Sequence, residues 1–221
     1  MKIKRFLHKI FVLIILLAAL FVLAACSGKG QAKEPSFPST EFVSSTKLFS
    51  LYVPTGWSAH EVIPGANLVM ASTEAALDRY RNRNALESGE LVLNVGFLPL
   101  ALFQEKELSH LGIQSDSSPD AFLQSLLPMF VVGDEPARNV AGETALVTLG
   151  DGRDAGMLTF SKEGREGMTL VFRAGKDVFA FISAATYPGG LSESQEIIYA
   201  LATGVTYNGS QDALYQKLYG D

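Results

Sequence analysis

The sequence has a single cysteine, Cys26, and only three histidines among its 221 residues. One cysteine excludes a disulfide framework within the chain, and so few histidines argue against a histidine-rich zinc or iron site. Charged residues make up 19% of the chain, and its formal net charge is −5. The chain therefore lacks the basic excess that a nucleic-acid-binding protein needs to neutralise phosphates. Its 48% hydrophobic content excludes a disordered protein.

Glycine-rich phosphate loops are missing as well. Neither Gly-x-Gly-x-x-Gly nor Gly-x4-Gly-Lys-Ser/Thr occurs in the chain. Since about 150 residues are usually allowed per domain, the length predicts one domain plus an additional segment.

The N-terminus has the organisation of a secretory signal. Four basic residues come first: Lys2, Lys4, Arg5 and Lys9. The apolar run that follows, from Ile10 to Ala25, is shorter than the ~20 residues that a membrane-spanning helix needs. Its end, Leu23-Ala24-Ala25-Cys26, resembles the lipobox of bacterial lipoproteins, in which the cysteine thiol is acylated and the chain is cut in front of it. We therefore predict a signal peptide over residues 1–25 and lipidation of Cys26; an uncleaved signal anchor and a plain secretory signal are the alternatives.

Lipidation of Cys26 would place the protein on the extracytoplasmic side of a bacterial cell membrane. Two or more acyl chains suffice for stable anchoring, because each buried CH₂ contributes about 0.8 kcal/mol. Processing removes four basic and no acidic residues, which changes the formal charge from −5 to −9. Such a body is repelled by anionic lipid, so we expect the membrane contact to be made through the lipid on Cys26.

A polar tether precedes the folded body. Residues 27–40 contain two glycines and two prolines and show no apolar periodicity, so residues 26–40 are predicted to be the lipidated cysteine and a flexible tether. The rest of the chain, 41–221, is predicted to form a single domain.

Strand and helix patterns follow one another in the body without regular βαβ alternation. The expected strands are 47–53, 66–71, 91–97, 143–149, 156–160, 168–172 and 178–184. The last four are joined by turns too short for a crossover helix, which predicts an antiparallel meander. The expected helices are 74–80 after Ser72 and Thr73, one from Pro119 capped by Ser118, and one from Ser192 with a capping box to Gln195. We expect an α+β domain with one antiparallel sheet and helices on both faces.

Three segments resemble PsbP-like domains, a family named after an extrinsic subunit of photosystem II. The run 48–57 resembles the opening strand and its Pro-x-Gly-Trp turn. The run 140–145 is similar to a strand start of the family, although Thr144 stands where proline is common. The run 179–185, followed by a loop and a helix that closes at 205–207, resembles the C-terminal end. The resemblance implies an α/β/α sandwich with a central antiparallel sheet, found in secreted proteins and lipoproteins that act as accessory or binding subunits.

Two histidine motifs have spacings similar to those of catalytic or metal sites. Ser58 and His60 follow Gly56 and Trp57 in a run that begins like Gly-x-Ser-x-Gly, but the second glycine of a nucleophile elbow is missing, so Ser58 is expected to begin a strand. Glu107 and His110 have the Glu-x-x-His spacing of di-iron bundles, but in one copy only. We expect a solvated helix end there.

Two charged motifs also have simple structural interpretations. Asp151 and Asp154 flank a glycine turn but lack the alternating ligands and closing glutamate of a calcium loop, so a hairpin tip is expected. Arg79, Arg81 and Arg83 form a basic run that could contact an anionic partner, although a solvated face is the simpler interpretation.

The sequence thus predicts a non-catalytic binding or accessory module for a protein complex or a small ligand. It predicts Cys26 as the lipidation site and no catalytic, cofactor-binding or metal-binding residue. The expected partners are the membrane and a protein, and not nucleic acid. The alternatives are a structural envelope lipoprotein and a hydrolase that uses carboxylates, because paired acids leave no spacing signature.

Overall fold

The computed structural model describes residues 34–105, 108–127, 131–132, 135–136, 144–162 and 164–220. The predicted signal peptide and Cys26 lie outside these residues, as do Glu107 and residues 140–143 of the second resembling segment. Within the described part of the chain, no helix is long and apolar enough to cross a membrane.

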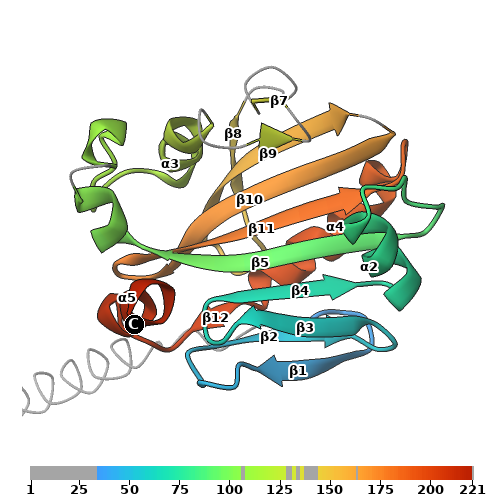
Figure 1. The fold of residues 1–221 in the computed structure, drawn as a ribbon, viewed down its shortest axis with the longest axis horizontal. Helices are drawn as coiled ribbons and strands as arrows, with labels where there is room; N and C mark the ends of the chain where they lie inside the picture. The colour runs from blue at the N-terminus through green and yellow to red at the C-terminus, as the bar shows by residue number, and fades with distance from the viewer. Residues whose placement is uncertain are drawn as a thin grey trace, which may run out of the picture. The chain divides into compact units, whose positions relative to one another are not determined.

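A seven-stranded antiparallel sheet forms the centre of the fold (Figure 1). Its spatial order is β3 (Ser58–Ile63), β4 (Asn67–Ala71), β5 (Leu91–Pro99), β11 (Val178–Thr186), β10 (Arg165–Gly175), β9 (Asp154–Lys162) and β8 (Ala145–Thr148). Strands β8 to β11 follow one another as hairpins, which confirms the predicted meander. Strand β5 is buried along most of its length and lies between β4 and β11, as its continuous apolar run indicates.

The expectation of one sheet is wrong. A separate three-stranded sheet is formed by β1 (Ser39–Val43), β2 (Phe49–Pro54) and β12 (Thr206–Tyr207). Strand β2 belongs here because five of its six residues are buried, so it packs as an inner layer and pairs with the C-terminal β12. Strand β1 begins two residues before the predicted start of the domain. A two-stranded pair joins β6 (Val131–Val132) and β7 (Glu135–Pro136).

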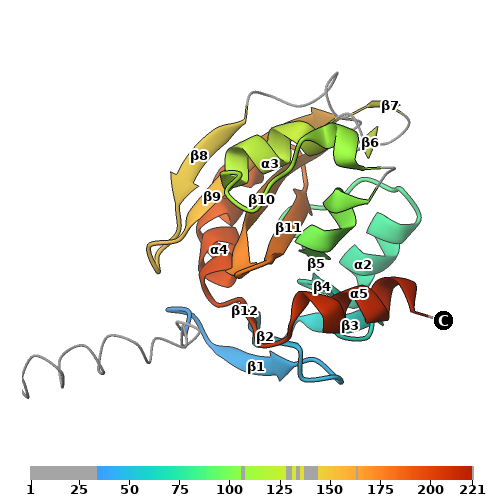
Figure 2. The same ribbon diagram turned by 90° about the vertical axis from the view of Figure 1, so that its left-hand side faces the viewer.

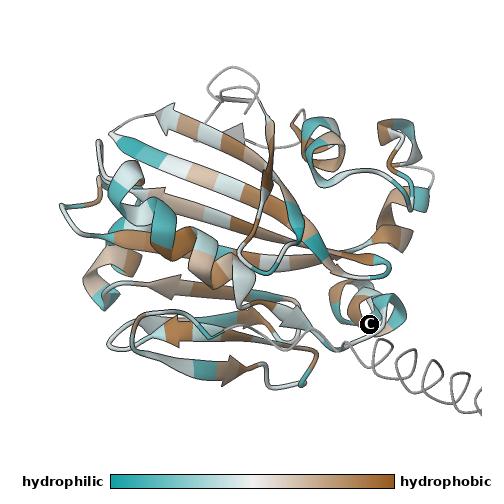
Figure 3. Cartoon of the chain, turned by 180° about the vertical axis from the view of Figure 1, so that it is seen from behind, coloured by the Kyte–Doolittle hydropathy of each residue, from teal (hydrophilic) through white to brown (hydrophobic). Residues whose placement is uncertain are grey.

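Both faces of the large sheet carry helices, which confirms the expected α+β architecture with an antiparallel sheet between helices. One face packs on α4 (Leu191–Thr203) and on the three-stranded sheet, around a cluster that includes Phe49, Phe97 and Phe172. From behind, α4 crosses this face (Figure 3). The opposite face carries α2 (Glu74–Arg81) and α3 (Pro119–Leu126), so that α4 and α2 lie on opposite sides of the sheet (Figure 2).

Two short 3₁₀ helices and a C-terminal helix complete the fold. The 3₁₀ helices η1 (Leu100–Gln104) and η2 (Ser109–Leu111) extend the hydrophobic cluster under α3. Helix α5 (Gln211–Tyr219), which the sequence analysis did not predict, packs on β5 and η1. The side chain of Ser210 caps it by accepting from the amide of Ala213.

The predicted caps are only partly correct. Thr73 caps α2, since its Oγ1 accepts from the amide of Ala76 at 3.0 Å. Ser118 precedes α3 in an extended conformation, with Pro119 in the first turn, but its side chain makes no cap bond. Helix α4 begins at Leu191 after Gly190, so the capping box predicted from Ser192 is wrong. The turn after Pro54 is present, and Gly56 adopts the positive φ of 86° that favours glycine there.

Candidate functional site

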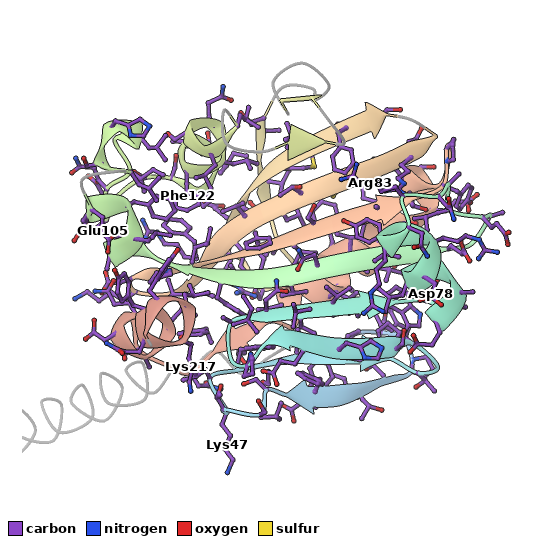
Figure 4. All side chains as sticks on the ribbon, viewed as in Figure 1. Lys47, Asp78, Arg83, Glu105, Phe122 and Lys217 are labelled. Atoms are coloured by element: carbon purple, nitrogen blue, oxygen red, sulfur yellow. The ribbon has the colours of Figure 1, made fainter. Side chains whose placement is uncertain are left out.

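The candidate site is the part of the large sheet between α2 and α3, which we call the opening. Helix α3 packs on β8, β9 and β10, and α2 packs on β4 and β5. The middle of β5 and β11 is visible between the two helices in Figure 1. In Figure 4, Phe122 of α3 lies to one side of this opening and Arg83, after α2, lies to the other.

On this face the ends of the central strands are buried, whereas polar residues in their middle are only partly buried. Near α3, Phe179 of β11 is fully buried in the cluster under that helix. Near α2, Val92 of β5 and Ala185 of β11 are buried in a second cluster. Between them, Asn94 and Ser183 are only half-buried. The apolar pattern of the strands is therefore interrupted where their burial is incomplete.

Strand register brings polar residues from four strands into this opening. Asn94 of β5 lies opposite Ser183 of β11, which in turn lies opposite Thr169 of β10. Asn67 of β4 lies opposite Gly96, one pleat further along β5. We call the following set the polar strip: Asn67, Asn94, Thr169 and Ser183, with the rings of Phe160 and Phe181. At about 4.8 Å between neighbouring strands, its polar residues extend about 14 Å from β4 to β10.

Hydrogen bonds within the polar strip fix its side chains and leave donors for a ligand. The Nδ2 of Asn67 donates to Oδ1 of Asn94 at 2.6 Å and to the carbonyl of Val95 at 3.0 Å. Asn94 accepts in this pair, so its own amide hydrogens can serve a ligand. The hydroxyls of Thr169 and Ser183 lie 3.2 Å apart. One proton joins this pair, which leaves the second hydroxyl hydrogen for another acceptor.

Two phenylalanine rings lie against glycines in the floor of the opening. A Cβ built on Gly96 would lie 2.3 Å from the Phe181 ring, and one built on Gly167 would lie 2.1 Å from the Phe160 ring. Each ring therefore occupies the space that a side chain on the neighbouring strand would fill, a device that protects strand glycines. Both phenylalanines are half-buried, so the floor combines polar groups with partly exposed aromatic rings.

The polar strip itself carries no charged side chain. Charged groups lie beside it and are already engaged. At the β3 end, Nε2 of His60 and Oε1 of Glu74 are 3.0 Å apart. At the start of β10, the Arg165 guanidinium lies 5.5 Å from the centre of the Tyr80 ring and donates to the carbonyl of Asn84. The hydrogen-bonding groups of the strip itself are therefore all neutral.

The residues Ser58 and His60 lie on β3, as expected, and His60 contacts Glu74 of α2. The Oγ of Ser58 is buried without a hydrogen-bond partner. His60 therefore does not hydrogen-bond to Ser58, and a buried Oγ is inaccessible to a substrate. The structure does not assemble a nucleophile and base here.

The other histidine motif gives no metal site. His110 lies exposed in η2, and Glu107 is outside the described residues. Over the ranges that the structure describes, no group of three His, Cys, Asp or Glu side chains is placed to hold a metal ion.

Asp151 and Asp154 flank the β8–β9 turn, as a hairpin tip requires. Asp151 pairs with Nε of Arg153 at 2.5 Å, and Asp154 accepts from the hydroxyl of Thr148. Arg153 also donates to the carbonyls of Ala202 and Thr203. It thus satisfies free carbonyls at the end of α4, and these charges have a structural role.

The arginines of the basic run after Glu74 have different surroundings. Arg79 is not a solvated cation, since it pairs at 2.5 Å with both Glu87 and Glu90. The Glu90 side chain is only 10% exposed, so this part of the run holds the 82–90 loop to α2. Arg81 is exposed in the last turn of α2.

No residue of the polar strip was predicted from the sequence. The available signal was Asn94, a polar residue within an otherwise apolar strand, together with Ser183 in a similar position on β11. Neither residue by itself indicates a site, because the register that joins them is a property of the folded sheet.

Comparison with known proteins gives no family. No family model matches the chain, and no curated protein matches it. Among solved structures, cyanobacterial PsbP from Synechocystis sp. PCC 6803 shows 14% identity and a TM-score of 0.44, covering 83% of this chain and 97% of that one. A Bacteroides thetaiotaomicron protein shows 12% identity and a TM-score of 0.41, and the match covers 78% of this chain and 50% of that one. A Pseudomonas aeruginosa protein of unknown function shows 9% identity and a TM-score of 0.36, and the match covers 78% of this chain and 99% of that one. At these values, none of the three assigns a function or a ligand to this chain.

Proposed function

We propose that this protein is a lipid-anchored extracytoplasmic binding module that holds its ligand or partner on the open face of the large sheet. The observation that carries the proposal is the polar strip. It is a hydrogen-bonded set of amides, hydroxyls and rings on the sheet between α2 and α3, of which Thr169 is buried and the others are half-buried. Binding sites combine apolar surface with a few oriented polar groups in this way.

The chemistry of these groups favours binding over catalysis. Amides, hydroxyls and phenyl rings orient a ligand but do not exchange protons readily near neutral pH. The acidic pairs near the site hold structural contacts, as Glu87 and Glu90 do with Arg79. A non-catalytic accessory role therefore accounts for the groups that the fold brings together.

The anchoring part of the proposal rests on the lipobox at Cys26. Cys26→Ser removes the thiol that would be acylated. We expect the variant to remain as an unprocessed precursor that carries no acyl label, whereas the wild-type chain is cut and labelled. Processing of the variant at the same site, with membrane association unchanged, would contradict lipidation at Cys26.

The binding part is tested by mild cross-linking on intact cells, isolation of the full-length protein and mass spectrometry of what accompanies it. We expect a reproducible companion that Asn94→Ala loses. Thr159→Ala is the matched control, because Thr159 is also half-buried in the sheet but alternates to the opposite face from the neighbouring Leu158. Equal recovery of the companion with both variants would place binding elsewhere.

A further inference from the structure

We propose that the polar strip binds a neutral saccharide, with pyranose rings on Phe160 and Phe181 and sugar hydroxyls on the neighbouring amides and hydroxyls. This inference rests on the proposed function and names its ligand class. It follows from three properties of the strip: its hydrogen-bonding groups, its flat rings and its lack of charge.

The hydrogen-bonding groups match a ligand with many hydroxyls. A sugar hydroxyl both donates and accepts, and the strip offers both possibilities within a short distance. Asn94 has amide hydrogens to donate, and the Thr169 and Ser183 pair has one hydroxyl hydrogen to donate and lone pairs to accept. The bond from Asn67 holds the Asn94 amide in place before a ligand arrives, which lowers the entropy cost of binding.

The rings match the apolar face of a sugar. Because Phe181 lies over Gly96 and Phe160 lies over Gly167, the rings are held close to the sheet by their neighbours. A pyranose presents a face of C–H groups, and burial of that face on a phenyl ring removes apolar surface from water. A flat ring beside an oriented amide suits such a ligand better than it suits a compact ion.

The charge distribution favours a neutral ligand over an anionic one. The residues next to the strip on this face, Val69, Gly96 and Val171, are uncharged. Arg165 and Arg173 of β10 share the face but lie further along the strand, over the rings of Tyr80 and Phe179. The predicted mature chain also carries a formal charge of −9, which disfavours an anionic ligand. A neutral ligand pays no such desolvation cost.

The strip is also long enough for more than one sugar ring. Its polar groups come from four adjacent strands, which span about 14 Å at the usual strand spacing. We therefore expect a short oligosaccharide to bind more tightly than its monosaccharide.

The test is titration calorimetry of the full-length protein in detergent against neutral tetrasaccharides: maltotetraose, cellotetraose and chitotetraose. Tetragalacturonate serves as the charged comparator. We expect at least one neutral probe to bind and the charged probe to bind less tightly. Asn94→Ala should weaken binding about tenfold, as the loss of a hydrogen-bonded group predicts, and Phe181→Leu should also weaken it. Thr159→Ala should bind like the wild type.

Two results would overturn the inference. One is the absence of binding by every neutral probe up to its solubility limit, and the other is binding that Asn94→Ala and Thr159→Ala leave equally unchanged. If neutral probes fail but Asn94→Ala still loses the companion found by cross-linking, the saccharide inference is wrong while the proposed function stands. If Asn94→Ala changes neither assay, both are wrong.

Discussion

Arg79 pairs with one buried and one exposed carboxylate, so the contribution of each pair to the stability of the fold can be measured separately. Its Nη1 pairs with Glu90, whose side chain is 10% exposed, and its Nη2 pairs with Glu87, whose side chain is 67% exposed. Arg79→Met removes the cation while keeping much of the aliphatic stem. We predict that this change destabilises the fold by loosening the 82–90 loop from α2, beside the polar strip.

The magnitude follows from the burial of Glu90. Breaking a buried ion pair by removing one partner costs about 3–5 kcal/mol, because a charge is left in a poorly solvated place. Glu90 keeps one hydrogen bond, from the amide of Glu87 at 2.8 Å, and Arg79 itself is 29% exposed. We therefore expect the lower end, about 3 kcal/mol, which lowers Tm by about 6–12 °C in a domain of this size. Glu87→Gln should cost less than about 1 kcal/mol, as exposed pairs do.

Urea unfolding followed by circular dichroism measures these differences. The double variant Arg79→Met/Glu90→Met is the control, since replacing both members of a buried pair with apolar residues is often close to neutral. It should be more stable than Arg79→Met alone. Equal costs for Arg79→Met and Glu87→Gln would refute the reasoning, because they would show that burial of Glu90 does not matter.

Three further predictions concern packing and pH. Gly156→Ala should destabilise the fold by about 1–3 kcal/mol, because its Cβ would lie 2.5 Å from the backbone oxygen of Pro119; Gly150→Ala, whose nearest neighbour is at 3.4 Å, should stay within about 0.5 kcal/mol in the same urea assay. Partial burial raises the pKa of Glu61, but hydrogen bonds from Gly65 and Ser45 outweigh it and hold that pKa below its usual 4.5. The stability that Glu61 contributes is therefore present above pH 4.5 and lost as pH falls through the lowered pKa. Thermal melts should therefore show the Tm values of Glu61→Gln and wild type converging in acid. A difference in Tm that stays constant with pH would contradict this. Burial raises the pKa of Tyr207 to about 12 from 10.0, so the stability that its neutral phenol contributes is present below pH 10.0 and lost as pH rises toward 12. Spectrophotometric titration of wild type against Tyr207→Phe should show one phenol that ionises at a higher pH than the others. Ionisation of that phenol near pH 10.0 would contradict its burial.

Much of the fold could be predicted because its signals are local. Apolar runs and short turns indicate the four-strand meander without knowledge of the tertiary structure, and β5 reads as a central strand for the same reason. Strand β1 could not be predicted, because the run Ser39–Val43 contains few apolar residues and gains its order by pairing with β2. Helix α5 is similarly short, with Leu214 as its one buried residue.

Cap chemistry was predictable only in part. Thr73 and Ser118 both precede helices and both have suitable side chains, yet only Thr73 uses its hydroxyl as a cap. The difference lies in side-chain orientation, which sequence does not specify. At the N-terminus of α4, Gly190 takes the cap position and Ser192 falls inside the helix.

The candidate site could not be predicted because it depends on strand register. Asn94 and Ser183 lie far apart in the chain and meet only because β5 and β11 pair with these residues opposite each other. A slip of one residue would turn either side chain to the opposite face of the sheet.

The open face is tested most directly by the accessibility of a cysteine introduced into it. The sequence has no cysteine besides Cys26, whose thiol would be acylated, so Ser183→Cys would supply a unique reactive thiol in the polar strip. We predict slower modification by a maleimide in native membranes than in the purified full-length protein, because the ligand covers position 183, and equal rates for Thr159→Cys on the opposite face. Equal rates for Ser183→Cys in both preparations would contradict the proposal that this face is the binding surface.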